Sequence, residues 1–411
     1  MTRPPADSTL PPPSPYLAAE DLPLKGIRVL EISHMIMGPA TGMTLADLGA
    51  EVIKVEPVDG DRTRRLKSAG IGYFPVFNRN KQSFAVDLKS AEGQKLVQDL
   101  ADRADIVLEN FRDDSLKQYG LDYEAVRARN PRCIYVSLKG FLSGPYKQRT
   151  ALDEVVQMMG GMAYVNGSED RPQRAAPSVN DILGGQFGVI GALSALHERT
   201  RTGVGKHIRA GLFETNLLLV AQFITQFELT GVAALPFGSK REPPWGVYDL
   251  FTTRDGDRVF VAVVSDVQWR TFAETFMPAG WAQDARLFSA VDREAARPWV
   301  VPAVAEVLKT WKTADLCTAL EKARLSYAPV NQPHDLLKDP HLTQGGALMA
   351  TMLPTGEHIS TPSLPLEFDG LKVGKRADPP KVGEHTVAIL KDLGLDDEAI
   401  ALLRHHGKIG V

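Results

Sequence analysis

Residues 27–55, IRVLEISHMIMGPATGMTLADLGAEVIKV, decide the fold. Ile27–Ile32 is a short apolar run typical of a buried strand, residues 40–48 predict a helix, and Glu51–Val55 predicts a second strand. Gly49 is expected to end the helix, because glycine readily takes the left-handed conformation that follows many helices. A strand, a helix and a strand at this spacing predict a right-handed crossover between two parallel strands.

The same alternation continues along the chain. Residues 83–88 predict a strand, residues 90–104 an amphipathic helix, and residues 105–109 and 133–138 two further strands. Ser90 marks the start of that helix, since its hydroxyl can accept a hydrogen bond from a free backbone N–H. Alternating elements of this kind predict an α/β fold with a doubly wound parallel sheet.

The length of 411 residues predicts two domains rather than one. A hairpin and several helices predict a smaller α+β domain over 240–340. We expect a large Rossmann-like domain over 24–235, to which the segment 345–411 returns, so that both ends of the chain build it. The proline-rich residues 1–23 are predicted to be disordered or extended.

Bulk composition narrows the class of protein. A net charge of −3 and a pI near 6.3 argue against nucleic acid or an anionic membrane as the main partner. Two cysteines give no disulfide framework and no metal-ligand spacing, which is typical of a reducing compartment. We find no segment apolar and long enough to span a membrane, and no signal-peptide core near the N-terminus. A cytoplasmic protein without a metal ion is therefore expected.

Polar residues follow several of the predicted strands. The first strand is followed by His34–Pro39 instead of the motif G-x-G-x-x-G, which argues against a nicotinamide or flavin site. A phosphorylated ligand with an aromatic base needs cations for phosphate and apolar platforms for the ring. The cations and amides expected to serve are Asn78–Lys81, Asn110, Arg112 and Lys139, and the expected platforms are Met37, Phe111 and Phe141.

A carboxylate stands at the start of a glycine-containing helix in Ser178–Gly185, SVNDILGG. Asp181 there has two interpretations, a helix N-cap and a catalytic nucleophile favoured by free N–H groups and the helix dipole. Gly184 and Gly185 would let a ligand or a second backbone approach closely. His34 likewise has two interpretations, a general base and a hydrogen-bonded structural residue.

Taken together, the chain from Leu24 onward resembles the class III (CaiB/BaiF-type) coenzyme A-transferases, which include formyl-CoA:oxalate and carnitine CoA-transferases. The motifs that carry the resemblance are Leu24–Glu31, Gly38-Pro39, Leu48–Glu56, Asn80–Ser83, Glu109–Phe111, Tyr119–Leu121, Asn130–Arg132, Ser178–Gly185, Arg201–Gly205, Ala328–Val330 and Gly383–Thr386.

This resemblance implies two interlocked rings forming a homodimer, with coenzyme A or acyl-CoA as substrate and no tightly bound cofactor. It implies that Asp181 attacks the CoA thioester, giving an aspartyl anhydride and then an aspartyl-CoA thioester, and that the helix N-terminus keeps the carboxylate ionised. The positions implied to contact CoA are Ile36, Met37, Asn80, Lys81, Asn110, Phe111, Arg112 and Lys139.

Departures from the family pattern suggest the substrate class. The formyl-CoA enzymes carry a glycine run where this chain has Phe237–Glu242, and Lys240 and Arg241 there could hold a distal carboxylate, favouring succinyl-CoA or another dicarboxyl-CoA. One alternative is a non-catalytic CoA-binding subunit of a heteromer. Another is an α-methylacyl-CoA racemase-like enzyme, although the His-Asp pair of racemases reads Leu152-Asp153 here.

Overall fold

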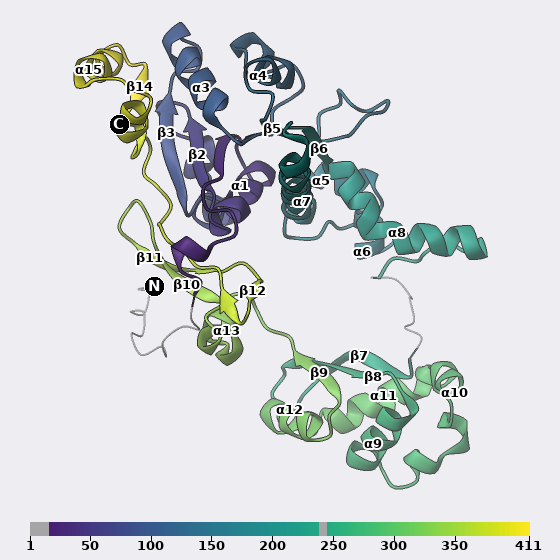
Figure 1. Ribbon diagram of the computed structural model, residues 1–411. Helices are drawn as coiled ribbons and strands as arrows, with labels where there is room; N and C mark the ends of the chain where they lie inside the picture. Colours follow the sequence, from purple (N-terminus) through teal and green to yellow (C-terminus); the bar gives the residue numbers. More distant parts are fainter. Residues whose placement is uncertain (1–15, 238–244) are drawn as a thin grey trace. The chain divides into compact units, whose positions relative to one another are not determined.

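The computed structural model describes residues 16–237 and 245–411. They form two compact units, each considered by itself (Figure 1). The first unit contains the described residues up to 237 and those from Asp339 onward, and the second contains residues 245–338. Lys240 and Arg241 lie outside the described residues.

A seven-stranded sheet with the order β14-β3-β2-β1-β4-β5-β6 forms the centre of the first unit. All neighbours are parallel except β14, which runs antiparallel to β3. The parallel α/β sheet predicted from the sequence is confirmed, and its six parallel strands have the order usual in dinucleotide-binding folds. The strands are β1 (Arg28–Ile32), β2 (Glu51–Glu56), β3 (Lys81–Val86), β4 (Ile106–Glu109), β5 (Ile134–Lys139), β6 (His207–Gly211) and β14 (Ile409–Gly410).

Helices cover both faces of this sheet, because alternate strand residues are apolar on each side and both sides must be buried. One core packs beneath α1 (Met37–Asp47) and α7 (Val179–Thr202). The opposite core packs beneath α3 (Ala91–Arg103), α4 (Tyr123–Arg129), α14 (Thr386–Asp392) and α15 (Asp397–His405). Further helices of this unit are α2 (Tyr73–Phe77), α5 (Asp153–Met159), α6 (Met162–Asn166), α8 (Leu212–Thr230) and α13 (Pro340–Gln344).

Helices α1 and α7 pack against each other at two glycines. A Cβ atom on Gly185 would lie 2.8 Å from the carbonyl oxygen of Met37, and one on Gly184 would lie 2.7 Å from the Met37 methyl group. The expected close approach of a second backbone is confirmed at Gly185, whereas Gly184 faces side-chain atoms.

Among the described helices, only α7 is long and apolar enough to cross a membrane, judged by length and composition. This corrects the expectation that no segment qualifies. In the structure α7 packs against α1 and the sheet, as a core helix does, and 39% of its most apolar window is buried.

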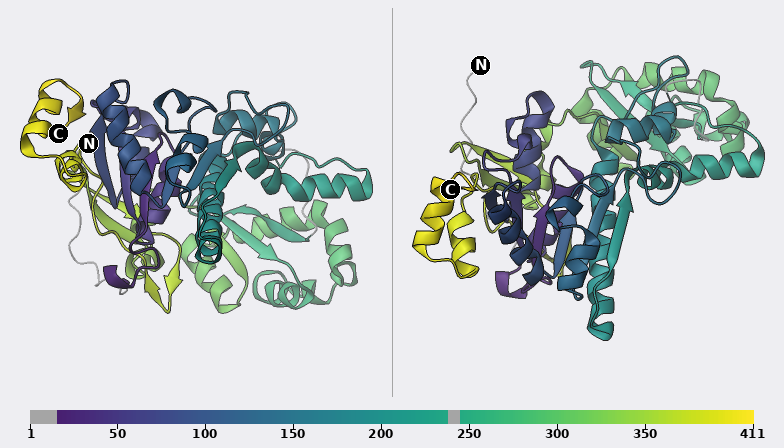
Figure 2. Two further views of the ribbon diagram at one scale, coloured as in Figure 1. Left: turned by 45° about the horizontal axis from the view of Figure 1, so that its top comes forward. Right: turned by 90° about the horizontal axis from the view of Figure 1, so that it is seen from above.

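The C-terminal segment returns to the first unit and completes its sheet. The two views of Figure 2 place the yellow C-terminal helices beside the edge of the sheet, where β14 pairs with β3. Asn80 holds this segment, since its Oδ1 accepts hydrogen bonds from the backbone N–H groups of Arg376 and Ala377. Short hairpins lie along the way, formed by β10 (Leu348–Met352), β11 (His358–Pro362), β12 (Glu367–Phe368) and β13 (Leu371–Lys372).

The second unit is built on a three-stranded antiparallel sheet. The hairpin of β7 (Val247–Thr252) and β8 (Arg258–Val263) forms as predicted, and β9 (Ser326–Pro329) adds to β8. A separate core packs beneath the sheet. The helices of this unit are α9 (Asp266–Phe276), α10 (Ala290–Ala295), α11 (Arg297–Leu308) and α12 (Thr313–Lys322).

Candidate active site

The loops that follow β1 and β4 meet at the point where the strand order reverses. Such a point leaves a crevice at the carboxyl ends of the strands, because the two connections leave toward opposite faces. Here Asn110, after β4, brackets the backbone of His34, after β1. The amide nitrogen of Asn110 donates to the His34 carbonyl at 2.8 Å, and its oxygen accepts from the His34 N–H at 3.1 Å.

Asp181 is the third residue of α7 and does not cap the helix. Ser178 occupies the N-cap position without a side-chain cap bond. The cap comes instead from α5, where Oδ1 of the buried Asp153 accepts hydrogen bonds from the N–H groups of Asn180 at 2.7 Å and Asp181 at 3.1 Å. The N-cap interpretation of Asp181 is therefore wrong, since a residue 28 positions earlier takes that role.

Burial raises the pKa of the Asp181 carboxyl to about 7, and the nearby charges of Asp153 and Glu154 add to this effect. The helix N-terminus was expected to keep Asp181 ionised at neutral pH. The shift runs against that expectation, and its largest cause is burial. The N–H groups of Asn180 and Asp181 donate to the carboxylate of Asp153 instead. Asp181 titrates near neutral pH as a result.

Asp181 lines a cavity of about 200 Å³ at the carboxyl ends of β1, β4 and β5. Four residues predicted to contact CoA share this cavity, namely Ile36, Met37, Asn110 and Lys139. Sequence reasoning did not assign the other members of the wall to the site, because all of them except Ser178 stand outside the motifs of the family resemblance. They are Met35, Tyr73, Leu138, Gly140, Ala151, Glu154, Ser178 and Leu212.

His34 and the Leu152-Asp153 pair also line the cavity. Burial lowers the pKa of His34, whose ring lies 5.1 Å from that of Phe111. Leu152 is 60% exposed and carries no titratable group, so no second acid or base stands at the position where racemases have histidine. The cavity thus has a carboxylate but lacks this part of a racemase pair.

Two further cavities lie next to this one along the chain segment 110–112. Asn110 and Lys139 also line a cavity of about 120 Å³, together with Phe111 and Arg112. Phe111 in turn lines a larger, mainly apolar cavity of about 640 Å³ with Val55 and other side chains. The predicted residues 110–112 therefore line three neighbouring cavities, one of which holds Asp181 and another of which is mainly apolar.

Lys139, predicted to contact CoA, is tied to acidic residues. Its Nζ lies 2.8 Å from a Glu109 carboxylate oxygen and 3.3 Å from Asp113, and donates to the Phe111 carbonyl oxygen at 2.7 Å. Its charge is thus balanced within the protein.

Lys81 and Asn80 lie away from the cavity wall. Lys81 is buried, and its Nζ lies 2.7 Å from a Glu31 carboxylate oxygen. The same nitrogen donates to the backbone carbonyl oxygen of Pro39 at 2.9 Å and to the side-chain Oδ1 of Asn78 at 3.1 Å. Burial lowers the pKa of Lys81 to about 8. The Asn80 side chain holds the C-terminal segment, as described above. Direct contact of these two side chains with CoA stays a prediction.

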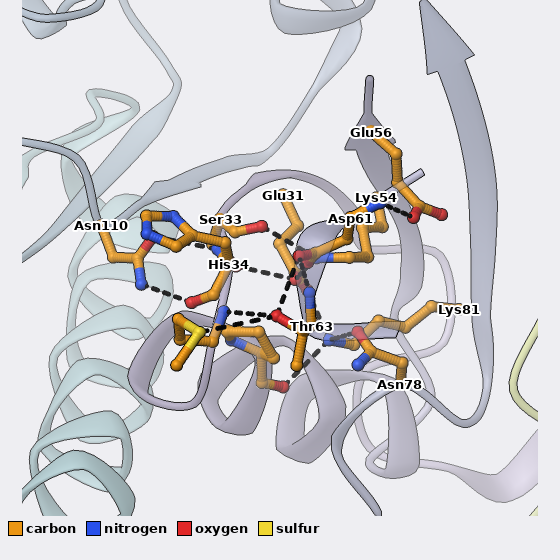
Figure 3. Close-up of polar contacts among 12 residues, drawn as sticks. Glu31, Ser33, His34, Lys54, Glu56, Asp61, Thr63, Asn78, Lys81 and Asn110 are labelled. Atoms are coloured by element: carbon orange, nitrogen blue, oxygen red, sulfur yellow. Dashed lines mark hydrogen bonds and ion pairs between the residues drawn. The ribbon is translucent and has the colours of Figure 1, made fainter. Parts of the chain in front are cut away.

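A buried ionic cluster supports the loop after β1 (Figure 3). Lys54 is at its centre, with Nζ 3.3 Å from Glu31, 3.1 Å from Asp61 and 2.8 Å from the Ser33 carbonyl oxygen. The hydroxyl of Thr63 donates to Asp61 at 2.8 Å and accepts from a backbone N–H of the same loop at 3.1 Å. The loop is therefore fixed from below by side chains of β2 and the segment after it. Among the described residues, no group of His, Cys, Asp and Glu side chains gathers as a metal site would require.

The fold and site together are a parallel α/β sheet with a half-buried carboxylate in the crevice at its switch point, where such sheets usually bind ligands. The sequence profile of CoA-transferase family III matches residues 24–386. The chain belongs to CoA-transferase family III. This match and the similarity to CoA-transferases over most of the chain identify it as a CoA-transferase.

Solved and characterised relatives agree. The chain is 33% identical to a succinate–glutarate CoA-transferase of Agrobacterium fabrum, over 90% of this chain and 96% of the relative. It is 31% identical to a succinyl-CoA–D-citramalate CoA-transferase of Chloroflexus aurantiacus, over 93% and 97%. The crystal structure of a CaiB/BaiF family protein from Brucella suis superposes with a TM-score of 0.81 at 33% identity, covering 90% of this chain and 99% of that one.

Proposed function

We propose that this enzyme moves coenzyme A from succinyl-CoA or another dicarboxyl-CoA to a carboxylic acid, with Asp181 as the nucleophile. The observation that carries the proposal is the position of Asp181 on the wall of the switch-point cavity, where burial holds its pKa near neutrality. The substrate class is supported by three relatives, whose names specify succinyl-CoA or succinate with glutarate, D-citramalate or mesaconate.

The reaction proceeds by covalent catalysis. A carboxylate oxygen of Asp181 attacks the thioester carbon, and the carbon–sulfur bond breaks. The CoA thiolate departs, and an acyl-aspartyl anhydride remains. The thiolate then attacks the aspartyl carbonyl, which releases the donor acid and forms an aspartyl-CoA thioester. The acceptor carboxylate attacks this thioester, expelling the thiolate, which finally takes the acceptor acyl group and frees Asp181. No proton is gained or lost overall.

The three neighbouring cavities suggest a path for the CoA molecule. The thioester lies at Asp181, the pantetheine chain follows the strip from Asn110 to Arg112, and the adenine occupies the apolar chamber walled by Phe111. Apolar chambers with a few polar groups are typical sites for such rings. Lys81 acts in this scheme as a positioning residue, because it fixes the Pro39 carbonyl at the start of α1 next to Ile36 and Met37.

An interlocked homodimer is part of the proposal. Helix α8 exposes apolar side chains, among them Leu218 at 58% and Leu229 at 80%, more than an isolated surface helix usually shows. A second copy of the chain would cover this face. Sedimentation of the purified chain tests the point, since a monomer at micromolar concentration would contradict it.

Peptide mass spectrometry after incubation with succinyl-CoA tests the mechanism. The expected result is a CoA-derived or succinyl-derived mass on the peptide that contains Asp181, and none in an Asp181→Asn variant. The chain should also exchange labelled succinate into succinyl-CoA without any second protein. An unmodified peptide and no exchange across a panel of acyl-CoA substrates would favour the non-catalytic subunit.

A further inference from the structure

A dicarboxyl-CoA needs a cation for its second carboxylate, and the described wall of the catalytic cavity has none to spare. Two basic side chains line that wall, Lys139 and His34. Lys139 already pairs with Glu109 and Asp113. His34 is neutral at physiological pH, because burial lowers its pKa. The binding cation therefore has to come from beside the cavity.

The short helix η2 (Arg62–Arg65) offers three arginines, and two of them are occupied. Arg64 donates to both carboxylate oxygens of Glu56, at 2.8 and 2.6 Å, and its guanidinium lies 3.7 Å from the centre of the Phe74 ring. Arg65 pairs with Asp59 at 3.1 Å. Arg62 is exposed, and among the described residues none forms an ion pair or a hydrogen bond with its guanidinium. Arg62 is thus the available cation of this helix.

The backbone on both sides of Arg62 is anchored next to the cavity wall. Asp61 and Thr63 are buried, and Asp61 pairs with Lys54 at 3.1 Å (Figure 3). Thr63 Oγ1 accepts a hydrogen bond from the N–H of Met35 at 3.1 Å, and Met35 lines the cavity in the left-handed conformation, with φ 63°. The backbone of Arg62 is therefore held one residue away from a side chain that contacts the cavity wall.

The charge of Arg62 acts on the cavity itself. It is one of the charges that lower the pKa of His34, a cavity residue, and charges in a solvated protein act noticeably only over short distances. A guanidinium can bind a carboxylate with two parallel N–H···O bonds.

We propose that Arg62 binds the distal carboxylate of the dicarboxyl-CoA substrate and so sets the preference of the enzyme for diacids. The inference rests on the proposed function, in which the acyl group lies against Asp181. It assigns the specificity to a described residue of the first unit, whatever Lys240 and Arg241 contribute.

Exchange of a labelled acid into its own CoA thioester is the suitable assay. Donor and acceptor are then the same acid, so no different acid competes for the subsite. Succinyl-CoA is compared with butyryl-CoA, which has the same chain length and no distal carboxylate. In an Arg62→Met variant, kcat/KM for succinyl-CoA should fall about 10- to 100-fold, the range expected for a lost hydrogen-bonded charge. The value for butyryl-CoA should stay within about twofold, and Arg62→Lys should recover part of the loss.

Arg65→Met is the matched control, since it removes a neighbouring arginine that pairs with Asp59, and it should leave the succinyl-to-butyryl ratio unchanged. Equal losses on both substrates, or an unchanged ratio in the Arg62→Met variant, would overturn the inference. A wild-type enzyme without any exchange or Asp181 adduct would instead refute the proposed function, so the two failures can be told apart.

Discussion

Replacing Asp181 by asparagine should stabilise the protein at alkaline pH. In the unfolded chain this carboxyl has its ordinary pKa of 3.8, whereas in the folded protein the pKa is about 7. Between these values the folded state holds a proton that the unfolded state has lost, so stability falls as the pH rises from about 4 to about 7 and then levels off. The neutral amide of asparagine has no such penalty.

The size of the effect follows from the two pKa values. The difference between 3.8 and about 7, at about 1.4 kcal/mol for each pKa unit, corresponds to about 4 kcal/mol at pH 8. At pH 5 the same difference in pKa destabilises the folded protein by about 2 kcal/mol. Asp181→Asn should therefore gain about 4 kcal/mol in the free energy of unfolding at pH 8 and about half of that at pH 5. This is a large gain beside the 5–15 kcal/mol that domains typically have.

Urea unfolding followed by far-ultraviolet circular dichroism measures this gain. All five tryptophans lie between residues 245 and 311, so tryptophan fluorescence reports the second unit and provides an internal reference. Glu228→Gln, at an exposed position of α8, is the matched control and should show no pH-dependent gain. A variant no more stable than wild type at pH 8, or a gain of equal size at pH 5 and pH 8, would refute the reasoning.

Two further predictions concern helix α7, which carries Asp181. The rate at which labelled succinate exchanges into succinyl-CoA should rise with pH through about 7, as Asp181 ionises. Glu154→Gln should move the midpoint of this pH–rate profile to lower pH, because it removes one of the charges that raise the pKa of Asp181. A midpoint that does not move would contradict this. Gly185→Ala should cost about 1–3 kcal/mol in urea unfolding, because its Cβ would lie 2.8 Å from the Met37 carbonyl oxygen. Gly184→Ala should cost less, because its Cβ would meet the flexible end of the Met37 side chain and, at 3.3 Å, the hydroxyl of Thr215. Equal costs would argue against this packing.

The sequence was sufficient for those parts of the fold that depend on neighbouring residues. The apolar runs of β1 and β2 and the glycine after α1 are local signals, and the parallel sheet follows from their alternation. The hairpin of the second unit was equally readable from its Asp255-Gly256 turn. The strand β14 was not, because two residues carry no pattern and its partner β3 is remote in the sequence.

The candidate site was only partly predictable for the same reason. Asp181 and the strip around Asn110 stand in motifs, so the family resemblance located them. The capping role of Asp153 depends on a contact across 28 positions between two helices. The burial that raises the pKa of Asp181 likewise shows only in the structure. Lys81 was predicted as a ligand contact because it is a cation after a strand, but its burial against Glu31 shows in the structure alone.

The pairing of β14 with β3 has a consequence for how the chain matures during synthesis. Strand β3 leaves the ribosome early, yet the strand that covers its edge follows only after the whole second unit has been made. The second unit is continuous in sequence and can fold as soon as it emerges, whereas the first must wait with an open sheet edge, a known hazard for aggregation. Translation speed and chaperone supply should therefore govern the yield of the first unit far more than that of the second.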